Sequence, residues 1–294
     1  MEDTLRPLYQ ERAGHPNTLG VMLLEKTDSN SSVTDHFDCI LLIIVKEAEE
    51  DWFVKHYEFE GKTAAMHIID EGLLNTWIET SGYRKIIEWL TTGRIIFDRN
   101  EYLSQLKEEL RDFPERTRKL RKAIEFAKLV RSYRECKELF EMKHYLDANS
   151  LMIRSLHYLA RLAVLEKGFH PEVIVWHQVK KIDPEVNKLY QELISSDEPV
   201  EKRIQLMMLA SDFAIHSRAE QGAAHLLEIM HERNEPWTFG ELKLHPEVEK
   251  YKLDLSILIE YLVERGIVGV NLAETKGKKI FHRQYYAVEE MKSV

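Results

Sequence analysis

The spacing of hydrophobic residues changes twice along this chain, and this change limits the fold more than any other feature. Residues 1–100 contain short apolar runs, residues 101–220 repeat apolar positions every three or four residues, and residues 221–294 combine both patterns. Short or alternating apolar runs indicate strands, whereas a spacing of three or four indicates an amphipathic helix. We therefore predict three domains with these boundaries in an α+β protein that is mostly helical.

The first domain is predicted to be a sheet with flanking helices. The run Cys39–Val45 is entirely apolar, which fits a central strand that is covered on both faces. Asp70 precedes a helical pattern and is the predicted N-cap of that helix. Strands are predicted at residues 19–24, 37–45, 53–59, 63–69 and 94–97, and helices at residues 5–12, 71–78 and 83–90.

The second domain is predicted to be a bundle of about five helices. Pro114 opens a long charged helix whose apolar positions are three or four residues apart. Asp147 or Asn149 is expected to cap the next helix, and Gly168 is expected to follow its last turn. The low content of glycine and proline, 12 and 8 residues in 294, also favours long helices.

The last domain has the element order of a winged helix. Helices are predicted at residues 223–232, after Thr238, and at residues 253–265, and two strands follow. Thr238 and Glu241 have the spacing of a capping box. In a winged helix the third helix is the element that reads DNA.

The charge of this domain argues against strong DNA binding. From residue 222 onward there are ten Lys and Arg against twelve Asp and Glu, and the third helix region carries Asp254, Glu260 and Glu264. Phosphate contacts require the opposite charge, and only the wing around Lys276 and Lys279 is locally basic. A packing or dimerisation module, for example in a homodimer, is the favoured interpretation.

The composition of the whole chain narrows the class of protein. With 44% hydrophobic and 31% charged residues the chain can bury a core, and its net charge of −9 disfavours a nucleic-acid coat protein. The longest apolar run is far shorter than the roughly 18 residues that span a bilayer, so no membrane association is expected. Cys39 and Cys136 form no disulfide framework, and the sequence begins without a secretory signal. We expect a cytoplasmic location.

The common catalytic motifs are absent from the sequence, namely the phosphate-binding glycine loops, the nucleophile elbow and the zinc-binding HExxH pattern. Five of seven residues in the run 116–122 are cationic. This run is predicted to be a helix face paired with acids such as Glu115 and Glu125, with phosphate or RNA contact as the alternative. Arg218 and His225 have six residues between them, which resembles the spacing of the Arg–His pair in ribonuclease-type helical domains. A polar residue usually follows the Arg in such pairs, but here Ala219 follows it and Gly222 is expected to interrupt the helix, so this activity is not expected.

One segment, which precedes the buried strand, contains acidic residues that are candidates for a catalytic metal site. A loop rich in Ser and Asp leads through Asp35 and Asp38 into the buried strand. Carboxylates two residues apart on a strand project to one side, and such a pair can hold the Mg²⁺ ions of phosphoryl transfer. Asp35 and Asp38 are three residues apart, so regular strand geometry does not bring them together. On spacing alone, both are better explained as polar residues at the end of a strand.

Two segments resemble nucleotidyltransferases. The run Gly20-Val21-Met22-Leu23-Leu24, followed by Phe37-Asp38 and Leu41-Leu42-Ile43-Ile44-Val45, resembles the opening of a polymerase-β-type nucleotidyltransferase domain. Gly93-Arg94-Ile95-Ile96-Phe97-Asp98 resembles the end of that domain in antibiotic-modifying members. The whole chain is similar to the three-part nucleotidyltransferase-like proteins of bacilli. The resemblance implies a nucleotidyltransferase-like sheet, a substrate-binding-like helical bundle and a C-terminal winged helix.

The sequence departs from the motifs of active members of this family. Where they carry a Gly-Ser pair, this chain has Glu25-Lys26 or the nearby Asp28-Ser29. By the resemblance, His36 and His67 occupy positions that are carboxylates in active members. Asp38 is the one secure carboxylate, with Asp35 as a second candidate. The resemblance also implies nucleotide contacts at Gly20, Lys26 and Ser29.

Three functions are compatible with the sequence. The favoured one is a nucleotidyltransferase-like protein whose altered metal site no longer supports nucleotidyl transfer. The second is an active nucleotidyltransferase, dependent on Mg²⁺ or Mn²⁺, that modifies a hydroxyl of a small molecule or a protein. The third is a regulator that senses a nucleotide or binds DNA through the winged helix. The sequence identifies neither the nucleotide nor the acceptor.

Overall fold

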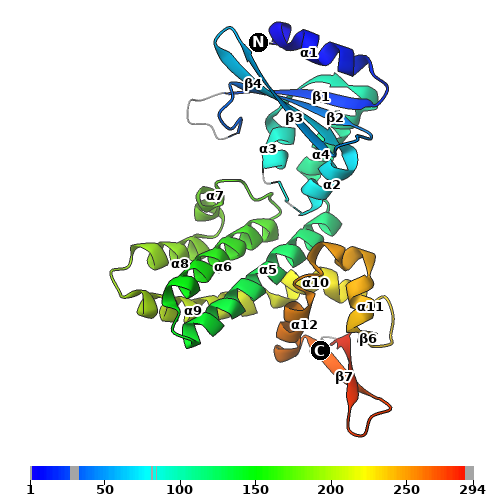
Figure 1. The fold of residues 1–294 in the computed structure, drawn as a ribbon. Helices are drawn as coiled ribbons and strands as arrows, with labels where there is room; N and C mark the ends of the chain where they lie inside the picture. Colours follow the sequence, from blue (N-terminus) through cyan, green and yellow to red (C-terminus); the bar gives the residue numbers. More distant parts are fainter. Residues whose placement is uncertain (1, 27–32, 81, 84, 289–294) are drawn as a thin grey trace. The chain divides into compact units, whose positions relative to one another are not determined.

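A computed structural model describes the chain except for residues 1, 27–32, 81, 84 and 289–294. Ser29, one of the predicted nucleotide contacts, lies outside the described residues. The chain divides into two compact units, Met1–Pro114 and Glu115–Val294, which are described separately. Figure 1 gives the labels of the helices and strands.

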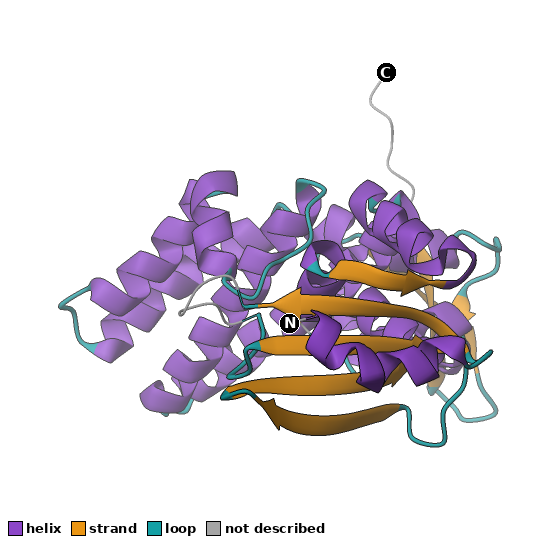
Figure 2. Ribbon diagram, turned by 90° about the horizontal axis from the view of Figure 1, so that it is seen from above, coloured by secondary structure: helices purple, strands orange, loops and turns teal. Residues whose placement is uncertain are grey.

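The first unit contains a five-stranded mixed sheet in the order β3-β4-β2-β1-β5 (Figure 2). β2 and β4 are parallel, and the other neighbouring strands are antiparallel. All five predicted strands are confirmed, and every residue of the central strand β2 is buried, as its apolar run predicts. The strands are β1 (Thr18–Glu25), β2 (Cys39–Val45), β3 (Trp52–Phe59), β4 (Lys62–Asp70) and β5 (Arg94–Asp98).

Helices cover both faces of this sheet. α1 packs Leu5 and Tyr9 against one face, and α2, α3 and α4 enclose the core on the other face (Figure 1). Because Leu103 and Leu110 of α4 belong to that core, the first unit runs past residue 100 and through Pro114. The helices are α1 (Glu2–Gly14), α2 (Glu71–Thr80), α3 (Lys85–Thr92) and α4 (Tyr102–Asp112), with a 3₁₀ turn, η1 (Arg99–Glu101), before α4.

The predicted cap at Asp70 is confirmed. Asp70 ends β4, and its Oδ1 accepts hydrogen bonds from the backbone N–H of Gly72, at 2.8 Å, and of Leu73, at 3.4 Å. These N–H groups belong to the first turn of α2, which has no acceptors of its own for them. The role of Asp70 as the cap of α2 therefore accounts for an acidic residue at the end of β4.

The second unit begins with the predicted helical bundle. Its five helices share one apolar core with the elements that follow them in the chain. α5 and α6 are the longest of the five and pack along each other. The bundle consists of α5 (Glu115–Glu141), α6 (Tyr145–Glu166), α7 (Val175–Ile182), α8 (Pro184–Ser195) and α9 (Val200–His216).

The two ends of α6 show where local sequence signals succeed and fail. Gly168 has a φ of 83°, and its N–H and that of Phe169 donate to carbonyls of the last turn, as predicted for a residue after a helix. The predicted cap at Asp147 or Asn149 is wrong. α6 already begins after His144, because Lys143 adopts a left-handed conformation and reverses the chain in a single tight turn.

The remainder of the second unit is a winged helix, as its element order predicts. Its three-stranded sheet has the order β6-β8-β7, with β6 between the first and second helices and β7 and β8 after the third. The capping box of Thr238 and Glu241 is confirmed. The two-residue strand β6 was not expected. The elements are α10 (Ala219–Met230), β6 (Trp237–Thr238), α11 (Phe239–Leu244), η2 (Pro246–Tyr251), α12 (Leu255–Glu264), β7 (Val268–Glu274) and β8 (Phe281–Ala287).

None of the helices in the described ranges is both long enough and apolar enough to span a bilayer.

Candidate functional site

Asp38 lies directly before β2, and its carboxylate is bound to the neighbouring strand β4. Oδ2 of Asp38 accepts hydrogen bonds from the backbone N–H of Thr63, at 2.8 Å, and from the Thr63 hydroxyl, at 3.2 Å. The Thr63 N–H is the largest cause of a lowered pKa at Asp38, and Lys26 and Lys62 lower this pKa further. Asp38 is therefore an ionised residue that fixes the beginning of the β2–β4 pairing.

Asp35 lies in a tight turn and points to a different partner. The Thr34 hydroxyl donates to the carbonyl of Phe37 at 2.7 Å, and Asp35 within this turn has a φ of 56°. Asp tolerates this left-handed conformation better than most residues. The Asp35 carboxylate forms an ion pair with Lys85 at the beginning of α3. The structure therefore places the two carboxylates, Asp35 and Asp38, with separate partners.

His67, one of the two histidines at the expected carboxylate positions, lies apart from Asp38. His36 is exposed in the turn before β2. In the parallel pairing of β2 with β4, Cys39 is opposite Ala64 and His67 is opposite Leu42. Asp38 is thus level with Thr63, and His67 lies four residues further along, about 13 Å at 3.3 Å per residue. The structure does not bring His67 and Asp38 together.

His67 belongs instead to a cluster of aromatic side chains. Its Nδ1 accepts a hydrogen bond from the Trp52 indole N–H at 3.1 Å, and the two rings stack at 5.8 Å. Trp89 meets the His67 ring edge-on at 4.9 Å, and Trp77 and Tyr83 complete the cluster. Burial lowers the pKa of His67 to about 4, so its ring is neutral at pH 7. This cluster has no sequence signal, because it joins residues from β3, β4, α2 and α3.

The segment before Asp38 packs onto the core between the sheet and helices α2–α4. Val33 and Phe37 contact this core, and Thr34 is fully buried. The carbonyl of Val33 accepts a hydrogen bond from the Trp89 indole N–H at 2.7 Å. Side chains of the protein itself therefore fill this part of the sheet face.

The proposed nucleotide contacts differ in their surroundings. Gly20 lies in the middle of β1, where a Cβ atom would be only 2.3 Å from Cδ1 of Leu103. The close packing of α4 on β1 thus explains the glycine without a ligand. Lys26 follows β1, and its N–H donates to the carbonyl of Asp38 at 2.9 Å. Of the predicted site residues that the structure describes, Lys26 lies beside Asp38, and Asp35 lies close enough to His67 for its charge to raise the pKa of that histidine.

These residues do not fit a divalent metal site. Mg²⁺ requires several oxygen ligands in octahedral geometry, and catalysis by two metals requires carboxylates that converge. Asp35 is paired with Lys85, Asp38 is bound to Thr63, and Thr63 is a neutral residue at the level of Asp38. Within the described ranges, no group of three or more His, Cys, Asp or Glu side chains is arranged to hold a metal ion.

Comparison with known proteins establishes the family. Residues 1–118 match a family model described as nucleotidyltransferase-like, residues 119–218 match a YgxA-like substrate binding domain, and residues 224–287 match a helix-turn-helix domain. A crystal structure of a nucleotidyltransferase-like protein from Exiguobacterium sibiricum is similar, with a TM-score of 0.85 and 38% identity over 98% of this chain and 100% of that one. The chain belongs to the nucleotidyltransferase-like family. A Bacillus subtilis protein, named uncharacterized protein YgxA, is 48% identical over 285 residues, 97% of each chain.

In this nucleotidyltransferase-like protein, acidic partners bind the basic run 116–122. Arg116 pairs with Glu247 at 2.7 Å, and Lys119 pairs with Glu228 at 2.5 Å and with Glu115 at 3.1 Å. The predicted pairing is thus confirmed for Glu115, and two further partners come from the winged helix.

The other acid expected to pair with this run, Glu125, is buried inside the bundle, where its charge raises the pKa of Arg121 and where it also has a second partner. Glu125 forms a buried ion pair with Arg161 of α6 at 2.8 Å. Arg121 is also buried and hydrogen bonds to Nδ1 of His170 at 2.7 Å. Burial is the largest cause that lowers the pKa of Arg121, to about 10. These charges lie inside the bundle, so they are not a solvated surface.

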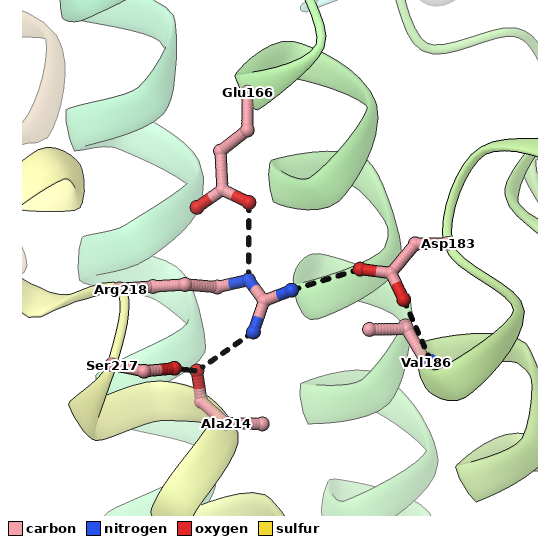
Figure 3. A network of polar contacts seen from close by, with 6 residues as sticks. All are labelled: Glu166, Asp183, Val186, Ala214, Ser217 and Arg218. Atoms are coloured by element: carbon pink, nitrogen blue, oxygen red, sulfur yellow. Dashed lines mark hydrogen bonds and ion pairs between the residues drawn. The ribbon is translucent and has the colours of Figure 1, made fainter.

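Arg218 and His225 belong to separate networks in the nucleotidyltransferase-like protein. The Arg218 guanidinium, between α9 and α10 in the chain, pairs with Glu166 of α6 at 3.1 Å and with Asp183 at the beginning of α8 at 2.8 Å (Figure 3). It also donates to the carbonyl of Ala214 in α9 at 3.1 Å. Burial raises the pKa of Glu166, and Arg218 opposes this rise. His225 is buried and hydrogen bonds to the Tyr251 hydroxyl at 3.0 Å. The two residues therefore do not form a ribonuclease pair. The expected interruption at Gly222 is wrong, because α10 continues through this glycine, which lies close against Phe126 of α5.

Proposed function

We propose that the first unit is a nucleotidyltransferase-like fold that serves as a binding and packing domain and does not catalyse metal-dependent nucleotidyl transfer. The observation that carries this proposal is the position of the Asp38 carboxylate. It accepts both the backbone N–H and the hydroxyl of Thr63, so it stabilises the junction of β2 and β4.

The charges around Asp38 support the proposal. A nucleotide triphosphate and its metal ions need several carboxylates to offset the loss of metal-bound water. Here Lys85 neutralises Asp35, and Lys26 and Lys62 lie close enough to Asp38 to lower its pKa. Lys26 and Lys62 thus balance Asp38 and the neighbouring Glu25, and the region does not gather the several carboxylates that a metal ion needs.

Nucleotide binding under this proposal is weak and independent of Mg²⁺. Lys26 and Lys62 would attract the phosphates, while Gly20 contributes nothing because Leu103 covers it. A nucleotide-sensing role remains compatible with these charges, since binding of this kind requires no chemistry.

Incubation with labelled nucleotides tests the proposal. The wild-type protein is incubated with labelled ATP, GTP, CTP or UTP, with Mg²⁺ or Mn²⁺, and with a panel of hydroxyl acceptors that includes the protein itself. Asp38→Asn removes the charge but keeps an acceptor for Thr63, and Asp112→Asn at the exposed end of α4 is the matched control. We expect no label transfer by any of the three proteins. Transfer by the wild type and Asp112→Asn that Asp38→Asn abolishes would overturn the proposal.

A further inference from the structure

α12 is the helix that a winged helix would place in the major groove of DNA. Its sequence, Leu255 to Glu264, contains no Arg, Lys, Asn or Gln. These are the side chains that most often read base edges through paired hydrogen bonds. The composition of α12 is therefore poor for reading DNA.

Ion pairs bind both ends of α12 to the helical bundle. Asp254 directly precedes α12, is buried, and pairs with Arg131 of α5 at 2.5 Å. At the other end Glu264 pairs with Arg134 of α5, and Arg265 pairs with Asp212 of α9 at 3.1 Å. Each charged side chain at the two ends of α12 thus meets one of opposite sign on the bundle.

An aromatic contact lies between these ion pairs. Tyr261 is 4% exposed, and its ring meets Phe126 of α5 edge-on at a centroid distance of 5.9 Å. Asp254, Tyr261 and Arg265 are seven and four residues apart, which places them on one face of the helix. The bundle therefore contacts one side of α12, while Ser256 on the helix remains exposed.

Arg283 of the wing forms an ion pair with Glu260 of α12. Arg283 of β8 donates to both carboxylate oxygens of Glu260, at 2.9 and 3.3 Å. This pair of hydrogen bonds orients the guanidinium toward α12 and places the charge of Glu260 beside it. The wing lysines Lys276, Lys278 and Lys279 lie outside this contact.

We propose that the winged helix of this protein is an intramolecular docking module, in which α12 recognises α5 and α9 of the bundle instead of DNA. The acids of the winged helix are then the partners of the bundle's bases, as Glu228 and Glu247 are for Lys119 and Arg116. This inference goes beyond the proposed function, because no part of it depends on Asp38.

A charge swap tests the docking contact directly. Asp254 makes no side-chain cap to α12, so its substitution removes the ion pair without removing a cap. We expect Arg131→Glu and Asp254→Arg each to lower the urea midpoint, and the double variant to recover at least half of the summed loss. Lys276→Glu on the wing is the control and should leave the midpoint unchanged. A double variant that loses the full sum of the two single losses would overturn the proposal.

Selection from a pool of random duplexes tests the same proposal without any change in stability. We expect no enriched sequence at physiological salt, and any low-salt binding should vanish when Lys276, Lys278 and Lys279 become Glu. Ser256 is exposed on α12, so Ser256→Asp should not alter that binding. An enriched duplex whose affinity falls at least tenfold with Ser256→Asp would overturn the proposal. Neither experiment measures nucleotidyl transfer, so its failure is distinct from failure of the proposed function.

Discussion

At the scale of single residues, Asp38 shows how a residue can keep its place in a motif and have a structural role. Its hydrogen bonds to Thr63 depend on the parallel register of β2 and β4, which pairs residues 25 positions apart. The sequence around Asp38 does not indicate which residue of β4 pairs with which residue of β2. The sequence therefore predicted that Asp38 lies at the beginning of a strand. Its partner, Thr63, could be identified only from the structure.

Asp38→Ala is expected to lower the stability of the first unit, because the Thr63 N–H loses its acceptor. Asp38→Asn should lower it less, since an amide oxygen can still accept this hydrogen bond. Urea unfolding followed by tryptophan fluorescence measures both effects. Asp112→Ala is the control, and an equal loss for Asp112→Ala and Asp38→Ala would contradict the structural role of Asp38.

His67 makes a second residue-scale prediction. Its pKa is about 4 in the folded protein and about 6.5 in an unfolded chain, so the unfolded state binds more protons between these values. Stability should therefore fall as the pH falls from about 6.5 to about 4, by roughly 2 kcal/mol. Urea midpoints measured across this range should show the slope in the wild type and a smaller one in His67→Gln. The same slope in both proteins would contradict the assignment.

For helices and strands, the sequence pattern predicts those features that are determined by residues close together in the chain. The buried run of β2, the cap at Asp70 and the capping box of Thr238 all act within a few residues, and each is confirmed. The beginning of α6 could not be predicted, because the left-handed turn at Lys143 overrides the capping preference of Asp147. A two-residue strand such as β6 is too short to produce a pattern.

The contact between β1 and α4 provides a prediction at this scale. Gly20→Ala should destabilise the protein by about 1–3 kcal/mol, because the new methyl group overlaps with the buried Leu103. In the background of Leu103→Ala, the same Gly20 substitution should cost much less. Urea unfolding of the four proteins in this cycle measures the coupling. Additive losses would indicate that Gly20 is needed for a reason other than packing.

At the scale of the whole chain, the sequence predicted the order of the three parts, and the family models and the structure agree with that order. The acids of the last part had no evident partners in the sequence. Asp254 and Arg131 are more than a hundred residues apart, so only the folded chain shows that they pair. Several of the acids that give the winged helix its net negative charge are therefore the ion-pair partners of basic residues on α5.

The structural role proposed for Asp38 excludes a catalytic metal site at this residue. Titration with Mn²⁺ in the presence of a nucleotide triphosphate, followed by electron paramagnetic resonance of the free ion, measures whether such a site exists. We expect wild type, Asp38→Asn and Asp112→Asn to leave the same amount of Mn²⁺ free at every concentration. A saturable Mn²⁺ site in the wild type and in Asp112→Asn, lost in a folded Asp38→Asn, would contradict it.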